Sequence, residues 1–167
     1  MTDKNVSIMN IGSMGYLPQV FKKIENEKKL NIVYLGGSIT MGCNATKTEL
    51  RYVDRSAKWW QTNFPDAEIS YFNAGIGATT SQFGVARVQE HVLDKQPDLV
   101  FVEFSVNDSS SPLFMETYES LVRRLLKAES VKAVVLINNL FYDTGTNAQG
   151  IHNAIGLHYD LPIVSER

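Results

Sequence analysis

Three short segments rich in glycine, hydroxyl and amide side chains are the places where this sequence could do chemistry: 36–42, 73–80 and 105–109. The first has Ser38 directly after two glycines, which let the backbone turn sharply. A serine hydroxyl in such a turn attacks a carbonyl carbon when a base removes its proton. The oxyanion that forms needs donors, which a backbone N–H of the second segment and the Asn107 amide would supply. The pattern predicts an acyl-transfer site that lacks only its base.

Each of these segments directly follows a run that predicts a strand. Short apolar or β-branched runs predict five strands, at 31–35, 69–72, 99–104, 133–137 and 162–164. The runs at 99–102 and 133–137 are continuously apolar, which is typical of parallel strands covered on both faces. Ligands of such sheets bind beyond the carboxyl ends of the strands, so we expect the three segments to meet at one edge.

Helical patterns fill the intervals between these strands. They predict helices at 52–64, 81–93, 112–128 and 148–159. Alternating strands and helices of this length predict an α/β fold, with a doubly wound, flavodoxin-like, parallel five-stranded sheet and helices on both faces. The 167 residues fit one domain, 1–167.

Composition excludes several classes of protein. The net charge of −2 gives no reason to expect nucleic acid or an anionic membrane as a partner, and no apolar run is long enough to span a bilayer. The single cysteine, Cys43, excludes an intrachain disulfide, and residues 1–7 are polar. We therefore expect a cytoplasmic protein, or a secreted one if a signal peptide was trimmed. The sequence has no metal or cofactor motif, so we expect neither.

The three segments resemble the conserved blocks of SGNH hydrolases, the GDSL-like lipases and esterases. Residues 36–40, Gly-Gly-Ser-Ile-Thr, resemble the first block, 73–81 the second and 105–108, Ser-Val-Asn-Asp, the third. Three blocks in order after predicted strands are a specific signal, whereas the Gly-Gly-Ser piece alone is weak. The resemblance covers the chain from about residue 10 onward and implies a serine esterase.

The resemblance also implies roles for individual residues. It makes Ser38 the nucleophile and first oxyanion donor, through its own N–H, and Asn107 a donor through its side chain. The second-block glycine of the family aligns with Ala78, whose N–H can serve provided that the loop does not need a positive φ there; otherwise Gly77 is the better candidate. Residues expected around the substrate are Gly37, Gly77, Asp108 and Tyr142. Asp108 has a second interpretation, in which it orients its loop.

The base is where the sequence departs from the family. Its histidine lies in an Asp-x-x-His block after the fifth strand, and a helix that covers one face of the sheet follows. This chain ends at residues 165–167, so we expect a domain truncated before that block, without the C-terminal helix and able to self-associate through the uncovered face. None of His91, His152 and His158 lies in such a block, and the sequence favours a surface histidine at 152 over a catalytic one.

Three functions remain in view. The favoured one is an esterase that removes acetyl or other short acyl groups from a carbohydrate or small ester, through an acyl-enzyme on Ser38. The alternative is a catalytically incomplete fragment or binding module with the same fold. A flavin- or phosphate-binding module is disfavoured, because residues 36–42 match neither common phosphate-binding glycine motif.

Overall fold

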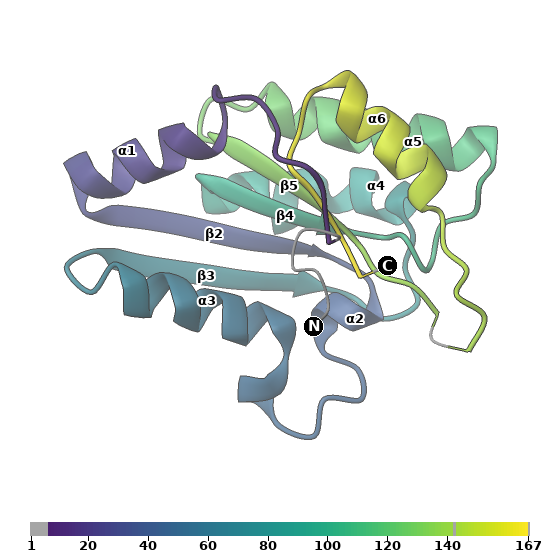
Figure 1. The fold of residues 1–167 in the computed structure, drawn as a ribbon, viewed down its shortest axis with the longest axis horizontal. Coiled ribbons are helices and arrows are strands. Elements are labelled where there is room, and N and C mark those ends of the chain that lie inside the picture. Colours follow the sequence, from purple (N-terminus) through teal and green to yellow (C-terminus); the bar gives the residue numbers. More distant parts are fainter. Residues whose placement is uncertain (1–6, 142, 167) are drawn as a thin grey trace.

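The computed structural model describes residues 7–141 and 143–166 (Figure 1). Its sheet has the strand order β1-β6-β5-β4-β2-β3. All neighbours pair in parallel except β1 and β6, which are antiparallel. The strands are β1 Ile8–Asn10, β2 Lys29–Gly36, β3 Glu68–Gly75, β4 Leu99–Glu103, β5 Ala133–Asn138 and β6 Ile163–Ser165. The five expected parallel strands are confirmed, and the expected count of five is corrected to six by the short edge strand β1.

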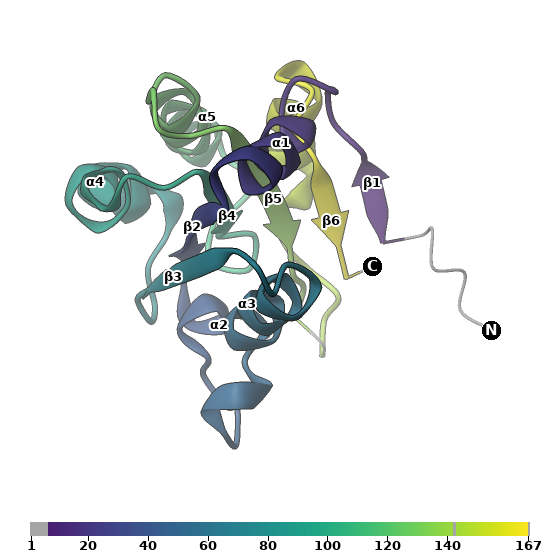
Figure 2. The ribbon, with the colours of Figure 1, turned by 90° about the vertical axis from the view of Figure 1, so that its left-hand side faces the viewer.

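The helices lie on both faces of the sheet, as expected for a doubly wound fold. They are α1 Leu17–Glu27, α2 Ser38–Met41, α3 Tyr52–Asn63, α4 Ser81–His91, α5 Pro112–Leu126 and α6 Gln149–His158. The four expected helices form, whereas α1 and the single turn α2 were not foreseen. Figure 2 shows α4 and α5 on one side of the sheet and α3 on the other.

Alternation along β2 shows how the sequence builds both layers. Val33 and Leu35 pack into the cluster beneath α4, α5 and α6, whereas Ile32 and Tyr34 pack into the cluster beneath α1 and α3. Successive side chains of a strand point to opposite faces, so a strand that is apolar throughout is covered on both. The carboxyl ends of β2, β3 and β4 are thereby held in a fixed register, Gly36 opposite both Gly75 and Glu103.

An apolar groove remains open on the α1 and α3 face, beside β1 and β6. It has a volume of about 290 Å³, and its lining includes Ile8, Phe21, Trp59 and Val164. Trp59 is 51% exposed, while its neighbour Trp60 is buried in the core. The expected uncovered face and self-association through it both stay predictions.

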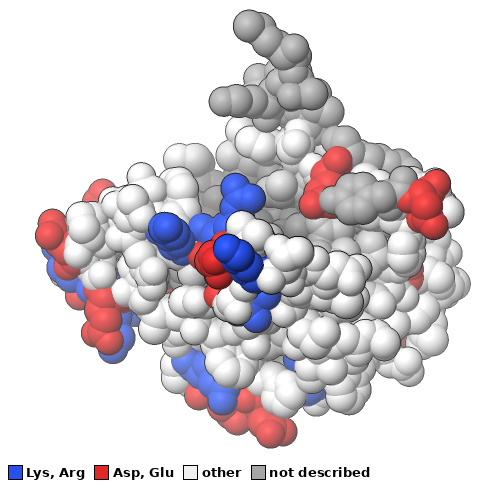
Figure 3. All heavy atoms as spheres, turned by 90° about the horizontal axis from the view of Figure 1, so that it is seen from below, with Lys and Arg blue, Asp and Glu red and all other residues white. Residues whose placement is uncertain are grey.

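The charge on one face of the molecule and the hydropathy of the helices give no sign of a nucleic-acid surface or of a membrane-spanning helix in the described part of the chain. Basic and acidic side chains lie interspersed on the face shown in Figure 3, without an extended basic surface. Among the described residues, no helix is long and apolar enough to cross a membrane. The cytoplasmic location stays a prediction.

Candidate active site

Ser38 is the first residue of α2, immediately beyond the carboxyl end of β2. The N–H groups at the start of a helix have no acceptor within the helix, so the Ser38 N–H is placed to serve an external one. The two glycines before Ser38 let neighbouring groups lie very close to the backbone. A Cβ on Gly36 would lie 2.6 Å from the Glu103 carbonyl oxygen, and a Cβ on Gly37 would lie 2.6 Å from Asn107 Oδ1. A side chain at either position would displace the backbone that carries Ser38.

Gly37 marks the point where the three expected segments meet. The same Cβ position that approaches Asn107 lies 3.4 Å from the carbonyl oxygen of Thr79, in the second segment. Asn73, at the start of that segment, donates from Nδ2 to the Thr40 carbonyl at 2.8 Å and accepts the Gly75 N–H at 2.9 Å. Segments far apart in the sequence are therefore fastened together around the turn that holds Ser38.

The second segment adopts the conformation on which its donor assignment depended. Ala78 has φ +57°, in the left-handed region that favours glycine. The loop therefore needs a positive φ at residue 78, the condition under which Gly77 was expected to be the better donor. Gly77 itself has no positive φ. Nevertheless, the N–H groups of both residues lack a protein acceptor in the described part of the chain, so either can donate to an oxyanion. Which of the two donates stays a prediction.

The third segment places the Asn107 amide beside Gly37. Its Oδ1 is buried without a hydrogen-bond partner among the described residues, and its Nδ2 has none there either. The loop is held by the N–H groups of Asn107 and Asp108, which both donate to the Phe104 carbonyl at 3.0 Å. An amide free of internal bonds on a fixed loop is suited to donate to a substrate oxygen.

Asp108 is buried, and both of its carboxylate oxygens have partners within the protein. Its Oδ1 accepts the Ser81 N–H at the start of α4 at 2.9 Å, and its Oδ2 lies 3.1 Å from His152 Nε2. Both oxygens are thus engaged internally, which favours the orienting role over contact with substrate. Contact of Asp108 with substrate stays a prediction, and Tyr142 lies outside the described residues.

His152 corrects the expectation of a surface histidine, because it is fully buried. Its ring stacks on Tyr118 with 3.6 Å between ring centroids, and burial lowers its pKa despite the neighbouring Asp108 carboxyl. A neutral imidazole that donates from Nε2 to Asp108 fits this arrangement. His91 is half-buried against Arg87, and His158 is exposed at the end of α6. In the described chain none of the three hydrogen-bonds to Ser38.

Two buried charged side chains near the nucleophile were missed by the sequence analysis. Glu103 ends β4 with no exposed surface; the Thr40 hydroxyl lies 3.4 Å from its Oε2, and Oε1 has no partner among the described residues. Burial raises the pKa of the Glu103 carboxyl from 4.5 to about 7. The other is Arg87, in α4. A carboxylate that ends the apolar run Leu-Val-Phe-Val was a signal that could have revealed Glu103.

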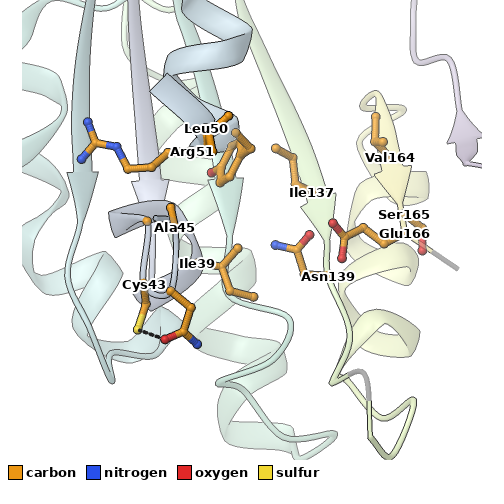
Figure 4. Close-up of a pocket in the computed structure, with 13 residues that line it drawn as sticks. Ile39, Cys43, Ala45, Leu50, Arg51, Ile137, Asn139, Val164, Ser165 and Glu166 are labelled. Carbon is orange, nitrogen blue, oxygen red and sulfur yellow. Dashed lines mark hydrogen bonds between the residues drawn. The ribbon is translucent and has the colours of Figure 1, made fainter. Parts of the chain in front are cut away.

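A cavity of about 370 Å³ opens beside the nucleophile turn (Figure 4). Ile39 and Cys43 line it on the α2 side, and Ile137, Asn139 and Glu166 line it from the ends of β5 and β6. Figure 4 draws the Asn139 amide with its oxygen toward Glu166; in the reversed orientation its nitrogen donates to the two carboxylate oxygens of Glu166 at 3.2 and 3.3 Å. The cavity is large enough for a small acyl group or part of a sugar. Within residues 7–141 and 143–166, no cluster of His, Cys, Asp or Glu has the make-up of a metal site.

Comparison with known proteins identifies the family of the chain. The model of the GDSL-like lipase/acylhydrolase family matches residues 34–159. A two-domain esterase active on acetylated mannans has 49% identity and a TM-score of 0.93, over 96% of this chain and 43% of that one. The chain therefore spans less than half the length of that esterase.

More distant structures share the fold. A catalytic mutant of an acetylxylan esterase from Geobacillus stearothermophilus has 18% identity and a TM-score of 0.66, over 80% of this chain and 74% of that one. An SGNH-hydrolase family esterase has 21% identity and the same TM-score of 0.66, over 81% and 75%. A search of curated protein sequences found no match.

Proposed function

Since the chain belongs to the GDSL-like lipase/acylhydrolase family, we propose that it is a serine ester hydrolase acting on acetyl or other short acyl esters of a carbohydrate. The observation that carries this proposal is the meeting of Ser38, the second segment and Asn107 around Gly37. The acetylated mannan esterase, at 49% identity, supports an acetylated polysaccharide as the substrate. A small ester that is not a carbohydrate would be hydrolysed by the same reaction, and it is the alternative substrate.

The proposed reaction begins when the Ser38 hydroxyl attacks the ester carbonyl and its proton passes to a base. The carbonyl oxygen becomes an oxyanion, which the Ser38 N–H, the Ala78 or Gly77 N–H and the Asn107 amide stabilise. Expulsion of the sugar hydroxyl, which takes up the proton, leaves an acyl-serine. Water then attacks the acyl-serine and releases the short carboxylic acid.

A second candidate is a binding module on the same fold. It is favoured by one observation: His152, whose helix follows β5 near the active edge, has its Nε2 directed at Asp108 and its ring buried. Such a histidine cannot accept the Ser38 proton without local unfolding. Loss of the base from a serine triad lowers kcat by on the order of 10⁴–10⁶, so a chain without one would hydrolyse esters feebly.

The decisive experiment measures acetate release from acetylated mannan and from p-nitrophenyl acetate. The chain is compared with Ser38→Ala and with Ser109→Ala, a control on an exposed serine of the third segment. Turnover that Ser38→Ala abolishes and Ser109→Ala preserves supports the esterase. Turnover that is equally slow in all three proteins contradicts it, and binding of mannan oligosaccharides by the same proteins would then favour the binding module.

A further inference from the structure

Arg87 is an arginine of α4 that lies almost entirely inside the protein. It is 6% exposed, and in the described part of the chain no carboxylate pairs with it. Its guanidinium instead donates to two backbone carbonyls, from Nη1 to Ala74 at 2.7 Å and from Nη2 to Gly36 at 3.1 Å. A planar fork of donors that spans two carbonyls is geometry that arginine provides and lysine does not.

The two carbonyls belong to the strand ends that lead into the oxyanion loops. Gly36 ends β2, and Gly37 and Ser38 follow it; Ala74 lies at the end of β3, at the start of the loop that carries Gly77 and Ala78. The Gly36 carbonyl also accepts the N–H of Ile76 at 3.1 Å. The Arg87 side chain thus links the ends of β2 and β3 to α4 through hydrogen bonds.

Burying this cation has a cost that the rest of the fold offsets only in part. Desolvation lowers the pKa of Arg87 to about 10, so it remains protonated at neutral pH. The Phe83 ring lies 5.8 Å from the guanidinium carbon and His91 Nδ1 lies 3.2 Å from Nη1, while Nε has no partner among the described residues. A buried charge without a counter-ion lowers stability relative to an apolar side chain of similar volume. The two charge-assisted hydrogen bonds that offset this cost both act on the strand ends that lead to the site.

We propose that Arg87 is a positioning residue, which sets the spacing between the Ser38 N–H and the second backbone donor of the oxyanion hole by tying together the carbonyls of Gly36 and Ala74. This proposal rests on the proposed esterase function. Arg87 does not touch substrate; it acts through the two loops. A donor displaced by about 1 Å from the developing oxyanion costs on the order of 100-fold in rate, so small shifts of these strand ends matter.

The first test reads the loops without any turnover. Amide hydrogen exchange is measured by mass spectrometry on the wild-type chain, Arg87→Lys, Arg87→Met and the control Arg124→Met. Arg124 is an exposed arginine that donates to the Val85 carbonyl, also in α4, at 3.2 Å. We expect exchange in 36–42 and 74–80 to rise about 10- to 100-fold in both Arg87 variants and to be unchanged in the control. Unchanged exchange in these segments, or an equal rise throughout the protein, would overturn the proposal.

The second test reads the oxyanion hole. Phenylboronic acid forms a tetrahedral adduct with a serine, and its affinity is measured beside kcat and KM for p-nitrophenyl acetate. We expect Arg87→Met to lower kcat and boronate affinity together, each by on the order of 100-fold, with KM within about twofold, and Arg87→Lys to recover part of the loss. A fall in activity matched only by a fall in the folded fraction would mean that Arg87 merely stabilises the protein.

The two tests separate the proposals. A wild-type chain without esterase activity would refute the function, while the exchange result would still decide whether Arg87 holds the loops. An active wild-type chain whose Arg87 variants keep their kcat would refute the positioning role alone.

Discussion

Replacing Glu103 by glutamine should raise the free energy of unfolding above pH 7 and leave it nearly unchanged near pH 4. Burial raises the pKa of this carboxyl from 4.5 to about 7, so the folded state holds its proton more tightly than the unfolded state. The stabilising contribution of that proton is complete below pH 4.5 and is lost as the pH rises toward 7. One pKa unit corresponds to about 1.4 kcal/mol, so the full loss is about 3 kcal/mol.

Glutamine keeps the size of the side chain and its hydrogen bonding near Thr40 but carries no charge to bury. Urea unfolding at a series of pH values from 4 to 8.5 would give the difference between the variant and the wild type. We expect that difference to grow from about zero to about 3 kcal/mol in favour of the variant. Glu116→Gln, on an exposed position of α5, is the matched control for the removal of a carboxyl, and the Glu103→Gln difference is compared with it at each pH. A wild type that is the more stable protein at pH 8 would refute the burial argument.

Other expectations test separate features. Ala78→Gly should raise the free energy of unfolding by about 0.5–1 kcal/mol, since glycine relieves the left-handed φ, while Ala86→Gly inside α4 should lower it by about 1 kcal/mol; thermal melts would show both. Burial lowers the pKa of His152, so the free energy of unfolding should fall as the pH drops below about 6.5; in His152→Gln this part of the slope should vanish, and a persisting slope would assign it elsewhere. Trp59→Ser should raise the dissociation constant of any self-association about tenfold in sedimentation equilibrium, whereas Phe83→Ser, exposed on α4, should not.

The features predictable from the sequence were those written in local patterns. Apolar runs located the parallel strands, and the polar segments after them located the turn at Ser38 and the loop at Asn107. The strand β1 was missed because three partly exposed residues carry no periodicity, and its pairing partner lies at the other end of the chain. The sequence analysis named a positive φ at Ala78 only as one of two cases, because an alanine in a sequence does not indicate a positive φ as a glycine does.

Burial of polar side chains was the hardest feature to predict, because it depends on which elements pack together. His152 occupies a helix position that would be exposed on an isolated helix, but Tyr118 of α5 covers its ring and Asp108 accepts a hydrogen bond from its Nε2. Arg87 likewise lies in a helix where arginine usually faces water, and only the fold brings two strand-end carbonyls within its reach. Such groups are recognised from contacts far apart in the sequence.

The antiparallel pairing of β1 with β6 brings the two ends of the described chain to the same edge of the sheet. Ile8 lies opposite Val164, and the Ser165 N–H donates to the Ser7 carbonyl at 2.8 Å. Although β2 lies three strands away from β6, Ser165 and Glu166 line the same cavity as Ile39, the residue after Ser38. A module fused before Ser7 or after Glu166 would therefore be tethered beside the nucleophile turn, where a short linker gives it a high effective concentration over that site. The same adjacency makes the chain a candidate for circular permutation, with a short bridge joining the present ends and new ends opened in a loop at the opposite edge.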